Sequence, residues 1–466
     1  MNNMKKSARR VFWLLALCFF LLLGYLGKLV MIDRAEISSN SYNIRMRNDE
    51  AGIQRGDILD ADGEVLATSV WQEDGSYLRE YPRARMAAHV TGYSSVGKTG
   101  VEAAANFTLM SVHQELLQRL QGIIEGRDPK GNDVVLTIDM DIQSIAGDLL
   151  GSAKGAVVVM EPSTGRVLAM QAYPDFDPNT VAADWEYLTA DEESPLVNRA
   201  TQGLYPPGST FKIITALAAM EYMPDWQTFT VNCSGEASFE NKVIHCYNNK
   251  AHGTVDMQEA MAESCNCYFA ALAQKIGAEN LSTVMKRCGI LSEYQFDLAY
   301  SQSVMHLNKD STESELVETA IGQGRTSASV LYMAMLISAV ANDGIMMRPY
   351  VIDHVQYANG EAGTTTVPEK LLQICTSEEA DTLNTMLISV VDSGTGTAAR
   401  NSGVTVAGKT GTAENATGKD HSWFVGYAPA EDPKVAIAVL IENSDYGKAT
   451  PIAGKVLQVA LEETAE

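Results

Sequence analysis

The longest apolar stretch of the chain lies close to its N-terminus. Residues 11–27 carry no charge, and after Lys28 the apolar run resumes as far as residue 32. About 22 mostly apolar residues suffice for a helix to cross a bilayer. Four bases precede the run (Lys5, Lys6, Arg9 and Arg10), and the positive-inside rule keeps that end cytoplasmic. The pattern predicts a cytoplasmic tail (1–10), a transmembrane anchor (11–32) and an extracytoplasmic remainder.

A cleaved signal peptide is the alternative reading of this segment. The run is longer than the roughly 7–15 apolar residues of a signal peptide, and no A-x-A-like site follows it. No later stretch approaches the length of a membrane span. We therefore expect an uncleaved, single-pass protein of the cell membrane.

Two regions are expected beyond the anchor. From 34 to 150 the chain mixes short strands with one helical stretch at 101–120, and an Asp62-Gly63 pair between apolar residues is typical of a hairpin. From 151 to 466 a strand hairpin at 155–173 comes first and strands at 404–412, 422–428 and 434–442 come near the end. Helical patterns lie between them, at about 210–223, 256–275, 326–343 and 376–392, and a last helix is expected at 449–463. This order predicts an α+β fold with one antiparallel sheet packed with helices.

The charge balance argues against nucleic acid as a partner. The net charge is -23, and residues 1–32 hold five bases and no acid. The rest of the chain therefore has 30 basic against 58 acidic residues, a net charge of -28. Such a body repels phosphate.

Seven cysteines are present, and none of the six beyond Cys18 has C-x-x-C spacing. Cys265 and Cys267 are too close in sequence to form a metal clip by themselves. Cys233 and Cys246 flank a short predicted hairpin, and in an oxidising compartment a bridge between them would stabilise the fold by about 3 kcal/mol. Two buried free thiols are the alternative, and the sequence leaves both open. It calls for no metal or organic cofactor.

Two catalytic signatures compete. Residues 92–99 read GYSSVGKT, a formally complete phosphate loop in which Lys98 and Thr99 would hold nucleotide phosphates. The preceding MAAHVT reads only as a weak strand, and the loop would face the outside, where nucleotide is absent. We interpret it as an ordinary glycine turn.

The second signature has three parts, S-x-x-K, S-x-N and K-T-G, in that order. Ser209 and Lys212 follow a Pro206-Pro207-Gly208 break that starts a helix, so both lie on one face of its first turn. There Ser209 is a candidate nucleophile and Lys212 its base, provided that burial and a neighbouring positive charge lower the lysine pKa.

The other two parts supply a proton relay and a substrate edge. Ser264 and Asn266 interrupt a helical stretch and are predicted to line a cleft as relay and amide partner. Lys409, Thr410, Gly411 and Thr412 end a strand pattern, and an edge strand accepts an extended peptide as a further strand. Lys409 would face a substrate carboxylate, and the Thr412 and Ser209 N–H groups would form an oxyanion hole.

With these motifs the sequence resembles the class B, monofunctional penicillin-binding proteins. The resemblance extends over residues 50–445, including RGDILD at 55–60, LTID at 136–139, GTGTAA at 394–399 and WFVGY at 423–427. The segment GYSSVGKTGVE also resembles that family's N-terminal module. One departure is Cys265, which stands where the family has Asp in its second motif.

The resemblance implies a membrane-anchored peptidoglycan D,D-transpeptidase with an N-terminal pedestal or dimerisation-like module (34–150) and a transpeptidase domain (151–466). It implies acylation of Ser209 by D-Ala-D-Ala stem peptides, inhibition by β-lactams, and catalytic roles for Lys212 and Ser264. Substrate would bind Asn266, Lys409, Thr410, Gly411 and Thr412. Only about 117 residues precede the transpeptidase domain, too few for a glycosyltransferase, so a membrane glycan polymerase is expected as partner.

Three other classes remain as alternatives. A serine D,D-carboxypeptidase or β-lactamase-like hydrolase would use the same serine, and a phosphate-loop protein would use Lys98. A β-lactam sensor would need a cytoplasmic output domain, for which the predicted tail is too short.

Overall fold

The apolar N-terminal stretch forms one helix, α1 (Asn2–Met31), in the computed structural model, which describes residues 2–31, 53–112, 129–401, 403–415, 418–444 and 447–464. No helix within these described ranges meets the length and hydropathy criteria for a membrane span. The predicted anchor therefore stays a prediction.

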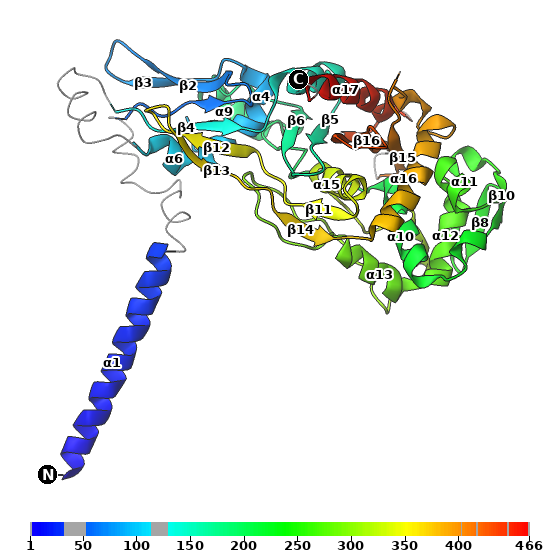
Figure 1. Cartoon of the computed structure of the whole chain (residues 1–466), viewed down its shortest axis with the longest axis horizontal. Helices are drawn as coiled ribbons and strands as arrows, with labels where there is room; N and C mark the ends of the chain where they lie inside the picture. The colour runs from blue at the N-terminus through cyan, green and yellow to red at the C-terminus, as the bar shows by residue number, and fades with distance from the viewer. Residues whose placement is uncertain are drawn as a thin grey trace.

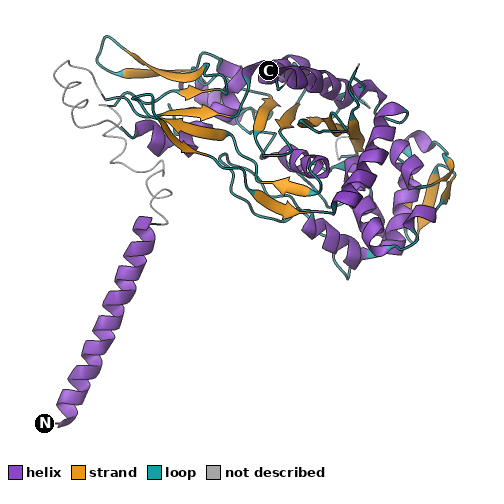
Figure 2. Ribbon diagram, viewed as in Figure 1, coloured by secondary structure: helices purple, strands orange, loops and turns teal. Residues whose placement is uncertain are grey.

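Beyond α1, strands of one sheet lie at one end of the body and a mostly helical lobe lies at the other (Figures 1 and 2). The sheet has six strands in the order β13-β12-β4-β1-β2-β3. Its strands are β1 (Ile58–Leu59), β2 (Val65–Trp71), β3 (Tyr77–Glu80), β4 (Asp133–Leu136), β12 (Ile352–Gln356) and β13 (Ala362–Thr365). The antiparallel pairing of β1 with β2 confirms the hairpin at Asp62-Gly63. Two of the six strands, β12 and β13, thus come from a part of the chain more than 200 residues after β4, and β12 pairs antiparallel with β4.

Three short helices pack beside this sheet: α4 (Ala84–Thr91), α5 (Gly100–Ala104) and α6 (Asn106–Met110). The helix expected at 101–120 is therefore broken at Ala105, and residues 113–120 lie outside the described chain. The weak strand expected at MAAHVT is wrong, because these residues form α4. A phosphate loop joins a strand to a helix, whereas here two short helices flank the GKT turn. This topology agrees with its interpretation as an ordinary turn.

A buried ion-pair cluster explains why the segment is built this way. Glu102, just after the turn, is fully buried and accepts hydrogen bonds from Arg55 Nε (2.6 Å) and Arg79 Nε (2.7 Å). Arg55 also donates to Asn106 Oδ1 at 2.6 Å. These cations hold the pKa of the Glu102 carboxyl below its usual value against the effect of burial. The segment after the turn thus places a carboxylate against Arg55, in the RGD segment that precedes β1.

The second sheet is antiparallel throughout, in the order β15-β16-β17-β5-β6. Its strands are β5 (Gly155–Met160), β6 (Val167–Tyr173), β15 (Ala407–Ala413), β16 (His421–Ala428) and β17 (Val435–Ile441). This arrangement confirms the predicted α+β architecture and all five expected strands. β16 and β17 lie between β15 and the β5–β6 hairpin. β15 is therefore an edge strand.

Helices cover both faces of this sheet, which explains why its strands are continuous apolar runs. Val158 and Leu440 belong to the larger core, on the side of α15, whereas Val157 and Val439 belong to a second core with Leu457 of α17. The helices of this part are α8 (Met140–Leu150), α9 (Val181–Ala190), α10 (Lys212–Tyr222), α11 (Met257–Ala262), α12 (Asn266–Ile276), α13 (Ala278–Arg287), α14 (Glu313–Ala320), α15 (Val330–Ala341), α16 (Ser377–Asp392) and α17 (Ala449–Glu463).

A small lobe beside α12 completes the body. It consists of the pair β7 (Val231–Cys233) and β10 (Gly253–Val255), the hairpin of β8 (Glu236–Phe239) and β9 (Lys242–His245), and the 3-10 turn η4 (Tyr247–Asn249). A further pair, β11 (Ile345–Met347) with β14 (Lys370–Gln373), lies next to α15. Short 3-10 turns η2 (Gly208–Phe211), η3 (Trp226–Thr228) and η5 (Thr397–Ala399) complete the elements.

Candidate active site

Ser209 lies in η2, which runs directly into α10, so the expected position at a helix start is confirmed. The residue before it has to be glycine. Gly208 has a φ of +55°, and a Cβ there would come within 2.5 Å of the Thr412 carbonyl oxygen. The Gly208 N–H donates to the Gly322 carbonyl at 2.8 Å. Backbone packing therefore presses the nucleophile turn against the end of β15.

Lys212 follows one turn later and is fully buried. Its Nζ donates to the Ser264 carbonyl and to Asn266 Oδ1, both at 2.7 Å, and to the Ser264 hydroxyl at 3.2 Å. Burial lowers the pKa of this amine to about 8, although neighbouring thiols oppose the shift. The S-x-x-K and S-x-N motifs therefore meet, as predicted, around a lysine that loses its proton readily.

Ser264 lies in the turn between α11 and α12, and Asn266 is the first residue of α12. Asp256 and Glu259 form a capping box at the start of α11, and the helix ends at Ala262, before Ser264 turns the chain with a φ of +56°. A serine in this conformation is strained and persists only where its surroundings hold it. Asn266 Nδ2 donates to the His245 carbonyl at 2.8 Å, which fixes the amide so that its oxygen faces Lys212.

The K-T-G motif lies on β15, as expected, and η2 packs against that strand. Gly411 is required at the contact, because a Cβ there would come within 2.9 Å of Thr210 Cγ2. Lys409 differs from the expectation. Its side chain is fully buried and donates to the Thr410 carbonyl at 3.1 Å, instead of facing the cleft. Burial and the charge of Lys212 hold its pKa well below the usual value.

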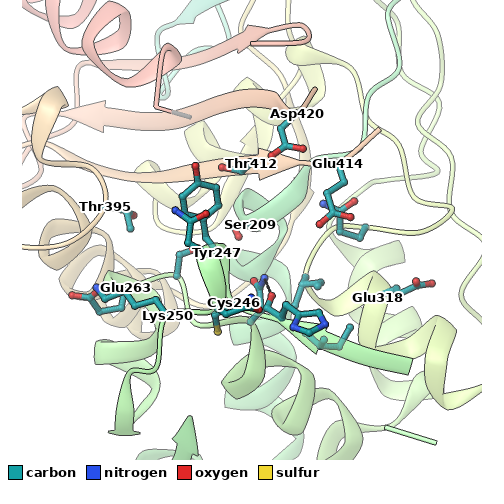
Figure 3. Close-up of a pocket in the computed structure, with 18 of the residues that line it drawn as sticks. Ser209, Cys246, Tyr247, Lys250, Glu263, Glu318, Thr395, Thr412, Glu414 and Asp420 are labelled. Atoms are coloured by element: carbon teal, nitrogen blue, oxygen red, sulfur yellow. Dashed lines mark hydrogen bonds and ion pairs between the residues drawn. The ribbon is translucent and has the colours of Figure 1, made fainter. Parts of the chain in front are cut away.

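A cleft of about 940 Å³ opens in front of these groups (Figure 3). Five of the eight predicted site residues line it: Ser209, Ser264, Asn266, Thr410 and Thr412. Figure 3 shows Ser209 between Thr412 of β15 and Cys246 of the small lobe. The structure thus brings the three motifs, which span about 200 residues, to one cavity. Lys212 and Lys409 are fully buried and do not line it.

Thr395 is a site residue that the motif analysis missed. It lines the cleft, and its Oγ1 lies 2.6 Å from Thr410 Oγ1. Its N–H donates to the Ala262 carbonyl at 3.1 Å, next to the S-x-N turn. The only signal was the GTGTAA run, which the family resemblance included without giving this threonine a role.

Two acidic side chains of the cleft wall are held in ion pairs. Glu263 accepts a hydrogen bond from Lys250 Nζ at 2.6 Å, and Glu318 pairs with Lys242. These carboxylates are turned toward the lobe lysines, as Figure 3 shows for Glu263 and Lys250.

Cys233 and Cys246 are free thiols in the structure, with their sulfurs 3.6 Å apart. This separation is a contact and not a bond, since a disulfide has an S–S distance of about 2.05 Å. The second alternative from the sequence, two buried thiols, is the one that the structure contains.

Comparison with known families agrees with the site geometry. The family model described as penicillin binding protein transpeptidase domain matches residues 155–458. The model described as penicillin binding protein A dimerisation domain matches residues 55–134. The chain belongs to the penicillin-binding protein family.

Named relatives of this penicillin-binding protein cover nearly its whole length. It is 34% identical to the peptidoglycan D,D-transpeptidase PbpA of Mycolicibacterium smegmatis, over 99% of this chain and 100% of the relative. The D,D-transpeptidase domain of a peptidoglycan glycosyltransferase from Eggerthella lenta has a similar crystal structure, with 39% identity, a TM-score of 0.82, and 89% and 99% of the two chains covered. Penicillin-binding protein A of M. tuberculosis, solved as a penicillin G acyl-enzyme complex, has 32% identity, a TM-score of 0.80, and 89% and 100% covered.

Proposed function

We propose that this protein is a peptidoglycan D,D-transpeptidase that acylates Ser209 with D-Ala-D-Ala stem peptides and is inhibited by β-lactams. The supporting observation is the position of Ser209, at the start of α10, in one cleft with Ser264 and Asn266 and above a buried Lys212. Relatives that match over nearly the full length are named peptidoglycan D,D-transpeptidases.

The residues divide the chemistry as follows. Neutral Lys212 takes the proton of Ser209 as its oxygen attacks the carbonyl of the penultimate D-Ala. The proton passes through the Ser264 hydroxyl, 3.2 Å from Lys212 Nζ, to the departing amine of the terminal D-Ala. An amine of a second stem peptide then attacks the acyl-serine, and the cross-link forms as Ser209 leaves with a proton.

The edge strand supplies the binding frame. The free edge of β15 accepts the stem peptide as an additional strand, and the hydroxyls of Thr410 and Thr412 line the same cleft. We assign the N–H groups of Ser209 and Thr412 to the oxyanion hole. This assignment is supported by the packing of η2, which contains Ser209, against β15, which contains Thr412. Lys409 is fully buried and acts through its hydrogen bond to the Thr410 carbonyl of the edge strand.

Membrane attachment and a glycan polymerase partner are part of this proposal. The 17 uncharged residues at 11–27 lie in α1, and four bases precede them in the same helix. This pattern supports an anchor with the catalytic part outside the cell membrane. There the polymeric substrate is made, and a membrane glycan polymerase would supply it.

Labelling with a fluorescent penicillin tests the function. The full-length chain should take up about one label, and Ser209→Ala should take up none. The exposed Ser163→Ala, which leaves the cleft unchanged, serves as the control. Equal labelling of the wild type and Ser209→Ala would contradict the assignment. Formation of a cross-linked dimer from synthetic stem peptides would indicate a transpeptidase. Release of free D-Ala alone would indicate a carboxypeptidase.

A further inference from the structure

The tryptophan of β16 reaches the turn that carries the nucleophile. Trp423 is fully buried, and its indole Nε1 donates to the Pro206 carbonyl at 2.9 Å. Pro206 and Pro207 have no backbone N–H, so backbone hydrogen bonds can hold these two residues only through their carbonyls. The Pro207 carbonyl accepts from the Thr210 hydroxyl at 2.7 Å, within the turn itself. The bond from Trp423 therefore joins the turn before Ser209 to the antiparallel sheet.

The glycine of the K-T-G motif makes this contact possible. Gly411 of β15 pairs with Trp423 of β16. A Cβ at Gly411 would lie 2.9 Å from Trp423 Cβ and 3.1 Å from the Pro207 carbonyl oxygen. A side chain at this position would therefore push the indole and the turn apart. The space that the motif glycine leaves free is thus shared by the indole and the nucleophile turn.

A second aromatic ring, that of Tyr205, lies against the indole at the start of the turn. The two rings meet edge to face, with their centroids 6.4 Å apart. The Tyr205 hydroxyl donates to Glu442 Oε1 at 2.7 Å, and Arg199 Nε donates to the same oxygen at 2.9 Å. A carboxylate and a guanidinium from two distant segments thus fix the ring against which Trp423 packs.

We infer that Trp423 is a positioning residue for Ser209. Its hydrogen bond, three residues before the nucleophile, sets where the Ser209 hydroxyl lies relative to Lys212 and the Thr412 N–H. Trp423 acts through the Pro206 carbonyl, since it is fully buried and is not among the described residues that line the cleft. A small displacement of an attacking oxygen slows its reaction strongly, because attack requires close approach and alignment. The inference rests on the proposed function, in which Ser209 is the nucleophile.

The kinetics of acylation by penicillin G, measured on the full-length chain, test this inference. Trp423→Phe keeps an aromatic ring but removes the N–H, so the Pro206 carbonyl loses this donor. The limiting acylation rate at saturating penicillin should fall roughly fivefold to a hundredfold. The penicillin concentration that gives half of this rate should stay within about twofold of the wild-type value.

A control separates positioning from stability. A less stable fold would lower the fraction of chains that react, and the final amount of bound label measures that fraction independently of the rate. Trp185→Phe, at a half-buried tryptophan of α9, is the matched variant and should leave both kinetic quantities unchanged.

A second variant tests the same inference with a smaller change. Tyr205→Phe retains the ring and loses only the hydroxyl that bonds to Glu442, so the limiting rate should fall roughly two- to tenfold. Because both changes act through the position of one turn, their effects in the double variant should combine to less than the product of the two factors.

Three results would overturn the inference alone: wild-type limiting rates in both variants, a half-saturating concentration that rises at an unchanged limiting rate, or effects that multiply fully in the double variant. A wild-type chain that penicillin does not acylate would overturn the proposed function together with this inference.

Discussion

Thr395 and Thr410 place their hydroxyl oxygens 2.6 Å apart on the wall of the cleft. The Thr395 hydroxyl also donates to the Ala262 carbonyl at 3.4 Å, so the Thr410 hydroxyl is the donor between the two threonines. Thr395 therefore ties Thr410 of β15 to the end of α11, next to the S-x-N turn.

Loss of the Thr395 hydroxyl should slow acylation. Thr395→Val removes one neutral hydrogen bond, worth about 0.5–1.5 kcal/mol, so acylation by penicillin G should slow roughly two- to tenfold. Thr395→Ser should retain the wild-type rate, and the exposed Thr397→Val is the control. The measurement is the second-order acylation rate constant, and an unchanged rate in Thr395→Val would remove this residue from the site.

The pKa of Lys212 predicts the pH dependence of acylation. The base is active when neutral, and burial lowers its pKa to about 8. The acylation rate should therefore rise about tenfold per pH unit below that value and level off above it. Lys212→Arg, which stays protonated, should be slow at every pH. A rate that does not vary between about pH 6 and 9 would mean that another group is the base.

Lys409 should affect the rate of acylation although it does not face the cleft. Truncation leaves the buried Thr410 carbonyl without its Lys409 donor, a loss of about 1–3 kcal/mol. Lys409→Ala should therefore slow penicillin acylation roughly tenfold to a hundredfold. Lys98→Ala, in the GKT turn of the N-terminal module, should have no effect. Equal losses in the two variants would reverse our choice between the motifs.

Glu102 should be critical for stability rather than for catalysis. Glu102→Ala leaves two buried guanidinium groups without their carboxylate, and such losses destabilise by about 3–5 kcal/mol. We expect a lower urea midpoint, with normal acylation in the fraction that remains folded. The exposed Glu186→Ala should change neither quantity. A midpoint like that of the wild type would show that the cluster is dispensable.

The acyl-enzyme should be long-lived. The cleft carboxylate nearest the S-x-N turn in sequence, Glu263, is paired with Lys250 and is not directed at the acyl-serine. A penicilloyl-Ser209 adduct should therefore persist for many minutes, as followed by intact-protein mass spectrometry, and Glu263→Gln should not prolong it. Hydrolysis of penicillin through many turnovers per minute would favour the β-lactamase-like alternative.

The sequence predicts local structure here better than it predicts long-range contacts. The central strands are apolar on both faces, and Pro207 and Gly208 mark the break before Ser209. The strands and the start of α10 are therefore predicted correctly from the sequence. The single helix expected at 256–275 is interrupted by Ser264, as its polar residues indicated. By contrast, Thr395 becomes a site residue only because distant segments of the chain meet. Nothing in residues 352–365 indicates that they join a sheet formed mostly by residues 58–136.

That hairpin, β12 and β13, makes the two parts of the body topologically inseparable. A fragment that ends at residue 150 would lack two of its six strands and expose the backbone edge of β4, whereas a fragment that starts at residue 151 would carry an orphan hairpin. We therefore expect neither part to fold by itself. β12 also connects the six-stranded sheet to Asp297, whose carboxylate accepts the N–H groups of Val351 (2.7 Å) and Ile352 (3.0 Å). The hairpin is thus a mechanical linkage into the half of the molecule that contains the cleft.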